Sequence, residues 1–356
     1  MKQLSQIYLL LLLFLLLSGC STVSYYSQAV SGHLSLMWSG KSVTHLIQRS
    51  DTRPELKHKL QLSQAARRFA EERLSLPVGG AFSDYVALDR PWVLVNLIAV
   101  PEFSLQPNRW CYPVVGCQAY RGYFSLEDAR AEAADFQARG YDTFIGGVTA
   151  YSTLGWFDDP LHSGFTALPE DRMVALMFHE LAHRVLYIDE DTAFNESFAT
   201  AVELEGLKLW LELRGESVLF NRALTRLEHR RKTLELVEQT NARLNRLYRE
   251  QNALGTELVR NRKAQLLTQL AQAYADLSKH FPEPGPFGSP PVTLNNANLA
   301  LFRQYNQHVP AFRQLLRDAG GDFPRFYRQV AALAEAPEAV RNQRLASLSQ
   351  RFVEDL

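Results

Sequence analysis

Apolar residues along this chain recur mainly at the three- and four-residue spacing of amphipathic helices. This spacing predicts helices over residues 24–76, 169–187 and 195–214. Ser125 has the position of a helix cap, and Gly140 stands just past the end of the helix that this cap would start. Most of the chain is therefore expected to be helical.

The longest helical pattern runs from about residue 217 to residue 280, where leucine and valine recur at intervals of three, four and seven. Gly255 is its only glycine. We therefore predict two long antiparallel helices joined near residues 252–256. A proline-rich loop over residues 281–291 follows, and the chain beyond it again carries a helical pattern.

Two segments have the composition of strands. Residues 92–100, WVLVNLIAV, are apolar without interruption, as in a strand covered on both faces. Residues 143–150, TFIGGVTA, contain Gly146 and Gly147, which suits a sheet edge that another backbone can approach closely. The expected fold class is α+β and mostly helical, with a small mixed sheet, a long antiparallel helical hairpin and a C-terminal helical region.

The chain has 356 residues, enough for two domains or for one domain with a large insertion. Its 38 acidic and 38 basic residues balance, so no field of the whole molecule would attract it to nucleic acid. Along the predicted hairpin, however, bases outnumber acids. We interpret these bases as a solvated face; the alternative is a projecting arm that touches anionic lipid or cell-wall polymer.

The first twenty residues have the layout of an export signal. Lys2 is followed by an apolar run over residues 7–17, too short to span a membrane comfortably, and then by LSGC. This layout resembles a bacterial lipoprotein signal. The resemblance implies that Cys20 becomes the lipid-carrying N-terminus, with Ser21 beside it pointing to the outer membrane, facing the periplasm. A plain signal anchor with an incidental cysteine is the alternative.

Cys111 and Cys117 lie in the run WCYPVVGCQAYRGYF. Disulfides form in exported proteins, and Pro113 and Gly116 favour a turn that would bring the two sulfurs together. We therefore expect a disulfide between these cysteines. Two buried free thiols are the alternative.

The segment FHELAHRVLYIDEDTAFNESFA, residues 178–199, has the pattern of a metal site. On a helix, His179 and His183 project from one face a turn apart, within reach of a single zinc ion. Glu180 lies about 100° round the axis, where it can hold a water on the metal. Glu196 begins the next helix and is the expected third ligand. The alternative is two core histidines on an ordinary amphipathic helix.

HELAH followed by NESFA resembles the gluzincin zinc peptidases, in which HExxH supplies two ligands and a glutamate on a later helix supplies the third. The runs WCYPVVGCQAYRGYF, GGVTAYSTLGWFDDPL, FHELAHRVLYIDEDTAFNESFA and LNNANL, together with the lipoprotein signal, are similar to the bacterial family of predicted aminopeptidase lipoproteins. The similarity spans nearly all of the chain after Cys20. It implies a gluzincin-like core and the activity of a zinc metallopeptidase.

The resemblance also implies one Zn²⁺ per chain, held by His179, His183 and Glu196. Glu180 would be the general base: it would take a proton from the zinc-bound water as this water attacks a peptide carbonyl, and pass the proton to the departing amine.

The carboxylate that orients the histidine ligands is less well defined. Thermolysin-like enzymes place an aspartate four residues after the glutamate ligand, and Thr200 occupies that position here. Asp191 or else Asp189 could accept the second ring N–H of a ligating histidine. A solvated acidic turn is the alternative for both residues.

Stabilising the oxyanion of a tetrahedral intermediate requires a further donor. Tyr305 is the first choice and His308 the second, and a surface aromatic is the alternative for each. The strand that contains Gly147 could pair with an extended substrate backbone, in which case Tyr151 and Ser152 would line the cleft.

Asp158 and Asp159 could bind the free amine that an aminopeptidase recognises, or form a simple Asp-Asp-Pro turn. The expected organisation is a signal peptide over residues 1–20, a peptidase core over 21–214, a helical hairpin insertion over 215–281, and a loop with C-terminal helices over 282–356 that completes the catalytic cleft.

These observations predict an aminopeptidase-like zinc metallopeptidase, lipid-anchored in the bacterial cell envelope. Its expected partners are a peptide substrate, the membrane and an envelope component at the hairpin, without nucleic acid. One alternative is an envelope scaffold in which the zinc site is structural and the hairpin is the functional part. Another is hydrolysis of a different amide, such as a cell-wall peptide crosslink.

Overall fold

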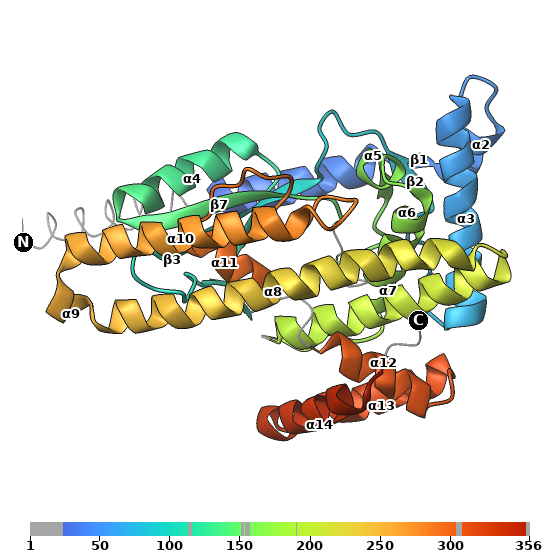
Figure 1. Cartoon of the computed structure of the whole chain (residues 1–356). Helices are drawn as coiled ribbons and strands as arrows, with labels where there is room; N and C mark the ends of the chain where they lie inside the picture. Colours follow the sequence, from blue (N-terminus) through green and yellow to red (C-terminus); the bar gives the residue numbers. More distant parts are fainter. Residues whose placement is uncertain are drawn as a thin grey trace, which may run out of the picture.

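The computed structural model describes residues 24–112, 116–150, 153, 157–189, 191–303 and 308–353, and for residues 301–303 the backbone alone. The described chain is mostly helical with three small sheets, which confirms the predicted α+β class (Figure 1). None of its helices has the length and apolar character that crossing a bilayer requires. Cys20 and the rest of the predicted signal lie outside the described residues.

The central sheet consists of β6 (Arg121–Tyr123), β3 (Leu94–Pro101) and β7 (Tyr141–Val148), in that order, and packs between α4 (Leu126–Ala138) and α11 (Asn296–Arg303). All pairings in it are antiparallel. Val95, Leu97 and Ala99 of β3 contact α4, whereas Ile98 and Val100 cluster with residues of α11. The apolar strand is therefore covered on both faces, as predicted, and β7 forms the predicted edge.

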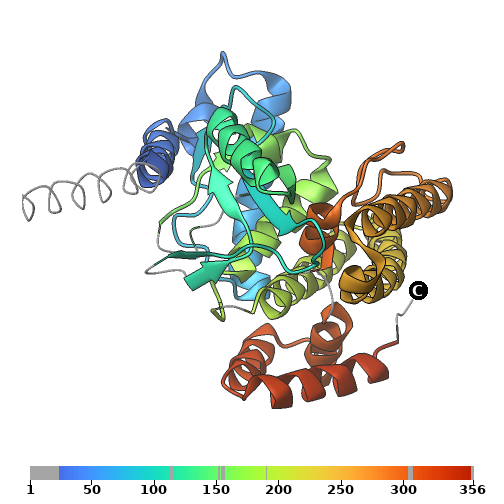
Figure 2. The ribbon, with the colours of Figure 1, turned by 90° about the vertical axis from the view of Figure 1, so that its left-hand side faces the viewer.

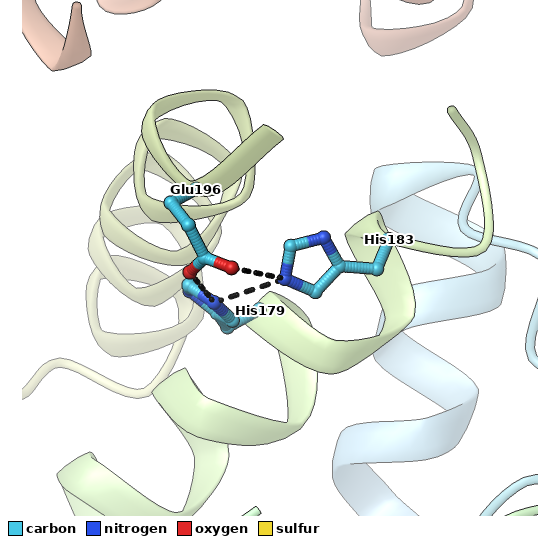
Figure 3. A group of neighbouring side chains, drawn as sticks. All are labelled: His179, His183 and Glu196. Carbon is cyan, nitrogen blue, oxygen red and sulfur yellow. Dashed lines mark hydrogen bonds and ion pairs between the residues drawn. The ribbon is translucent and has the colours of Figure 1, made fainter. Parts of the chain in front are cut away.

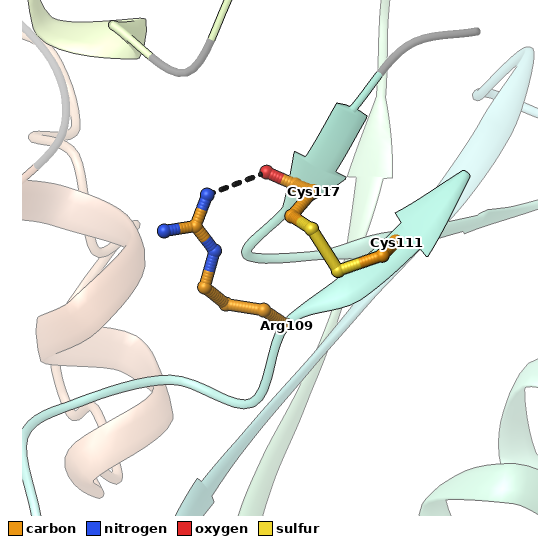
Figure 4. The surroundings of a disulfide bond; sticks show 3 residues. All are labelled: Arg109, Cys111 and Cys117. Carbon is orange, nitrogen blue, oxygen red and sulfur yellow. Dashed lines mark hydrogen bonds between the residues drawn. A yellow bond between two sulfur atoms is a disulfide. The ribbon is translucent and has the colours of Figure 1, made fainter. Parts of the chain in front are cut away.

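A second sheet is mixed, and a third is a short hairpin. The elements are β1 (Lys41–Ser42), β2 (Asp84–Val86) and β8 (Leu161–His162) in the mixed sheet, and β4 (Trp110–Tyr112) and β5 (Gly116–Gln118) in the hairpin. Cys111 and Cys117 are partners in the hairpin register, and the predicted disulfide joins them (Figure 4). Arg109 Nη2 donates to the Cys117 carbonyl at 3.0 Å and holds the start of the hairpin to its end.

The main hydrophobic core is formed where helices pack against one another. Its helices are α2 (Val43–Gln48), α3 (Pro54–Leu74), α5 (Ser163–Thr166), α6 (Glu170–Ala182), α7 (Thr192–Leu213), α12 (Val309–Asp318), α13 (Phe323–Ala334) and α14 (Glu338–Arg351). Phe178 of α6, Phe198 of α7 and Phe312 of α12 are fully buried in this core. The C-terminal helices form a separate layer beside α7 (Figure 2).

The prediction of one continuous helical segment over residues 24–76 is wrong in its middle. A helix covers residues 24–38, and β1 and α2 then interrupt the pattern before α3 begins. Ser42 caps α2 by accepting from the N–H of His45. Pro54 starts α3, because proline fits the first turn of a helix but cannot continue one that is already formed.

The predicted hairpin is present. It consists of a short 3₁₀ turn η1 (Ser217–Leu219), α8 (Phe220–Arg249), α9 (Gln251–Leu254) and α10 (Thr256–Ser278). Gly255, with φ of 81°, allows the chain to turn between α9 and α10. The hairpin does not project: it lies along the molecule beside the central sheet (Figures 1 and 2). Lys263 Nζ holds it there through Asp142 Oδ2 of β7 at 2.6 Å and the carbonyl of Glu102.

Candidate metal centre

The packing of α6 against α7 brings the three predicted ligands together (Figure 3). The Nε2 atoms of His179 and His183 are 3.2 Å apart. Glu196 places Oε2 at 3.3 Å from His179 Nε2 and Oε1 at 3.7 Å from His183 Nε2. One ligand atom from each residue lies within 4.8 Å of the others, so the three side chains converge on one point.

The local sequence explains this convergence. Glu170 and Asp171 in the first turn of α6 suit the positive end of its dipole. Asp191 caps α7 by accepting from the N–H of Phe194 at 3.0 Å. Buried Asn195, the first residue of NESFA, both donates to and accepts from the backbone of Ile188. These bonds fix the return of the chain and aim the next residue, Glu196, at the histidines.

The donor set fits a zinc ion. Two imidazole nitrogens and one carboxylate oxygen are the protein ligands of zinc sites that keep a fourth position open. Magnesium and calcium prefer sites built from oxygen alone. Glu180, predicted as the general base, lines the same cleft as these three residues.

The carboxylate that orients His179 is Glu203, which the sequence interpretation missed. His179 Nδ1 lies 3.0 Å from Glu203 Oε2. Glu203 follows Glu196 by seven residues on α7, so two helical turns place both on the same face, and this spacing was the available signal. Asp191, predicted for this role, instead caps α7 and pairs with Arg341 at 2.6 Å, because α14 packs close to the start of α7. Asp189 is exposed.

The electrostatics of the site follow from its burial. Burial lowers the pKa of His179, but hydrogen bonds to Glu196 and Glu203 outweigh it and raise this pKa well above its ordinary value. Burial raises the pKa of Glu180 to about 7 and lowers the pKa of His183 to about 4. Burial also acts to raise the pKa of Glu196, but His179 and His183 hold it below its ordinary value. A proton on His179 therefore lies between two carboxylates.

The metal centre opens into a cleft of about 1510 Å³. Its described lining includes the end of β7 with Gly147, the cleft-facing side of α6, the first turns of α8 and the proline-rich loop after α10. The predicted cleft residues Tyr151 and Ser152 lie outside the described residues, as does Tyr305. His308 is described, but it is buried, its backbone N–H donates to Ser197, and it is not among the described residues of the cleft wall.

Tyrosines on the described cleft wall were not predicted, and two of them, Tyr120 and Tyr187, lie close enough to Glu196 for its charge to act on them. Tyr120 follows the disulfide hairpin, and burial raises its pKa, with Glu196, Tyr187 and Glu180 acting in the same direction. The Tyr187 side chain hydrogen-bonds with Gln118, just after the disulfide. Tyr120 lies in a run singled out from the sequence, but no spacing within that run separates it from the neighbouring tyrosines.

Asp158 and Asp159, considered for amine binding, make other contacts. Asp158 accepts from the N–H of Gly80 at 3.1 Å and pairs with Arg184. Asp159 is buried and accepts from the N–H of Thr153 at 2.8 Å. Neither aspartate belongs to the described lining of the cleft.

The fold and the site together define an α+β protein with a candidate metal centre in a large cleft. A family model described as "Putative aminopeptidase" matches residues 24–345. The chain belongs to this family, whose description points to hydrolysis of peptide bonds, and the family expected from the sequence is confirmed at that level. The searches of curated proteins and of solved structures find no match to the chain.

Proposed function

We propose that the protein is a zinc-dependent peptidase that acts as an aminopeptidase. The observation that carries this proposal is the convergence of His179, His183 and Glu196 beside Glu180 in one cleft, in a chain of the aminopeptidase family. The two histidines and Glu196 would hold the ion. When bound, zinc polarises a peptide carbonyl and lowers the pKa of a water.

The protein's own residues supply the remaining chemistry in this proposal. Glu180 accepts a proton from the attacking water and delivers it to the departing amine. Glu203 holds the ring of His179 through Nδ1, which fixes the direction of Nε2. Tyr120 lines the same cleft, close enough to Glu196 and Glu180 for their charges to act on it, and we assign its hydroxyl as the donor to the developing oxyanion.

The edge strand β7 is suited to hold the substrate backbone. The carbonyl of Thr143 accepts from Asn295 Nδ2 at 2.9 Å, so the polar backbone groups of Thr143 point away from β3. Backbone direction alternates along a strand, which turns the N–H and C=O of Ile145 and Gly147 the same way. An extended peptide can therefore add to β7 beside the metal centre.

The hairpin supports the peptidase over the scaffold. Its first turns, with Arg226 and Arg230, line the same cleft as the metal ligands, and its far half is anchored to β7. A scaffold surface would have no need of this wall. We further propose that Cys20 carries the lipid that tethers the enzyme to the envelope, facing the periplasm; metabolic labelling with a radioactive fatty acid, lost in Cys20→Ala, tests this.

The decisive variant is Glu180→Gln, which keeps the shape of the side chain but cannot accept the proton. We expect zinc content to stay at one ion per chain and kcat on a cleaved peptide to fall by at least about a hundredfold. Elemental analysis and single-peptide assays measure the two quantities. Persistent turnover in the zinc-loaded variant would refute the role of Glu180, and cleavage of N-acetylated peptides at an undiminished rate would refute the aminopeptidase assignment.

A further inference from the structure

The cleft that contains the metal centre is also lined by a group of arginines, which we call the arginine wall. Four arginines line the described part of the cleft: Arg172, Arg222, Arg226 and Arg230. The acids in that lining are Glu180, Glu196, Glu203 and Glu283. The first three belong to the metal centre, and Glu283 pairs with Arg226 at 3.4 Å. Arg226 is therefore balanced by acidic partners, whereas Arg172 and Arg222 make no ion pair with the acids of the described lining.

The positions of these arginines follow from helix geometry. Arg222, Arg226 and Arg230 are spaced by four residues and form one stripe on α8. Arg226 Nη2 pairs with Asp171 Oδ2 at 2.9 Å, which fixes the stripe over the start of α6, next to Arg172. Arg172 and Arg222 are exposed and have no ion-pair partner in the described part of the chain. Arg230, one turn further along α8, is close enough for its charge to act on Glu196.

The distance from this wall to the metal centre is the length of a short peptide. Arg172 precedes His179 by seven residues on α6, which is about 10 Å along the helix axis. An extended peptide covers about 3.3–3.6 Å per residue. A group held at Arg172 and Arg222 thus lies about three residues from a bond at the metal centre, and a group near Arg230 lies closer.

We propose that the arginine wall binds the C-terminal carboxylate of a short peptide whose scissile bond lies at the metal centre. This inference rests on the proposed peptidase function and names its substrate class. A guanidinium group matches a carboxylate with two parallel N–H···O bonds, a geometry that also sets the direction of the ligand. The preferred substrates are free peptides of a few residues, and the N-termini of folded proteins are poor ones.

The test compares matched peptides on the zinc-loaded full-length protein. Peptides of three to five residues are supplied as the free acid and as the C-terminal amide, with free N-termini. We expect kcat/KM to be about tenfold higher for the free acids, and this preference to disappear in peptides of ten residues. Arg172→Gln and Arg222→Gln should each reduce the ratio of acid to amide. Arg243→Gln, on an exposed position of α8 outside the described lining, is the matched control and should keep the ratio.

An acidic side chain carries the same chemical group, so amidated peptides with glutamate or glutamine near the C-terminus form a second arm. If amidated peptides with glutamate are cleaved as well as the free acids, the wall reads side chains and the assignment to the C-terminus is overturned. Equal kcat/KM for acids and amides, or an unchanged ratio in both arginine variants, also overturns it while leaving the peptidase intact. A zinc-loaded protein that cleaves none of these peptides would instead refute the proposed function.

Discussion

The two ring nitrogens of His179 face different carboxylates. Nε2 points to Glu196 and to His183, whereas Nδ1 is held by Glu203 at 3.0 Å. A carboxylate on the far nitrogen fixes the tautomer and the angle of the ring and makes the imidazole a better ligand. Glu203 is therefore part of the proposed metal site although it is not one of the three residues that would hold the ion.

Replacing Glu203 with alanine should weaken zinc binding by about 10- to 100-fold. The three ligands stay in place, but the ring of His179 loses the bond that directs it. Competition with a chromophoric chelator measures the affinity. Glu212→Ala, an exposed glutamate on the same helix, is the control. Equal affinities in the two variants would show that Glu203 does not orient the ligand.

The ligand trio was predictable, but its surroundings were not. His179, His183 and Glu196 follow from local spacing on two consecutive helices, and local spacing can be read from a single chain. Tyr120 reaches the site from a segment about sixty residues earlier in the chain, and its place depends on how the sheet packs against α6 and α7. No periodic pattern records a contact of that kind.

At the level of the secondary-structure elements, one buried cation holds the helical hairpin. Lys263 Nζ contacts Asp142 Oδ2 at 2.6 Å, and its side chain is only 8% exposed. Asp142 Oδ2 also accepts from the backbone N–H of Asn296, and Tyr248 on α8 donates to the Asn296 side chain. The two helices of the hairpin, α11 and β7 thus share one polar network.

Lys263→Met should destabilise the protein by at most about 3–5 kcal/mol, because it leaves the partly buried carboxylate of Asp142 without its cation. Urea unfolding measures the loss. Lys279→Met, which removes a solvent-exposed pair with Asp276 near the end of α10, should leave the unfolding midpoint almost unchanged. A similar small effect of both substitutions would mean that the pair between Lys263 and Asp142 does not hold the hairpin in place.

The hairpin itself was predictable, and its docking was not. Leucine periodicity and Gly255 define the two helices and the turn. The pair between Lys263 and Asp142 joins residues 121 positions apart, and nothing in the local pattern marks this lysine among the many bases of the hairpin. The break of the helical pattern within residues 24–76 was missed because β1 is only two residues long and leaves little trace in the sequence.

At the scale of the whole molecule, the walls of the cleft come from segments that lie far apart in the sequence. β7, α6, α7, α8 and the proline-rich loop all contribute walls. The C-terminal helices support this arrangement from behind: Arg341 of α14 pairs with Asp191 at the start of α7, and Arg313 of α12 pairs with Glu205. Metal binding should therefore stabilise the entire fold.

At pH 7, zinc at a hundred times its Kd should stabilise the folded protein by about 2.7 kcal/mol, and at that same zinc concentration the gain should be smaller at pH 6 and larger at pH 8. The pKa of His179 is raised in the metal-free fold, so its proton contributes stability that is fully present below the unfolded pKa of about 6.5 and lost as pH rises through the folded value. Zinc must displace that proton, which becomes easier as pH rises. Thermal unfolding with zinc or a chelator at pH 6, 7 and 8 checks this, and a gain that shrinks with pH contradicts it.

The link between Cys111 and Cys117 has a practical consequence for anyone who prepares this protein. Gln118 and Tyr120 come directly after the second of these cysteines and form part of the cleft wall. Protein made in a reducing cytosol would have every proposed metal ligand. The segment with Gln118 and Tyr120, however, would lack the disulfide that holds its start beside the cleft. An assay on such a sample would therefore understate the peptidase activity of the oxidised protein. Oxidative refolding, or export during expression, belongs among the first controls.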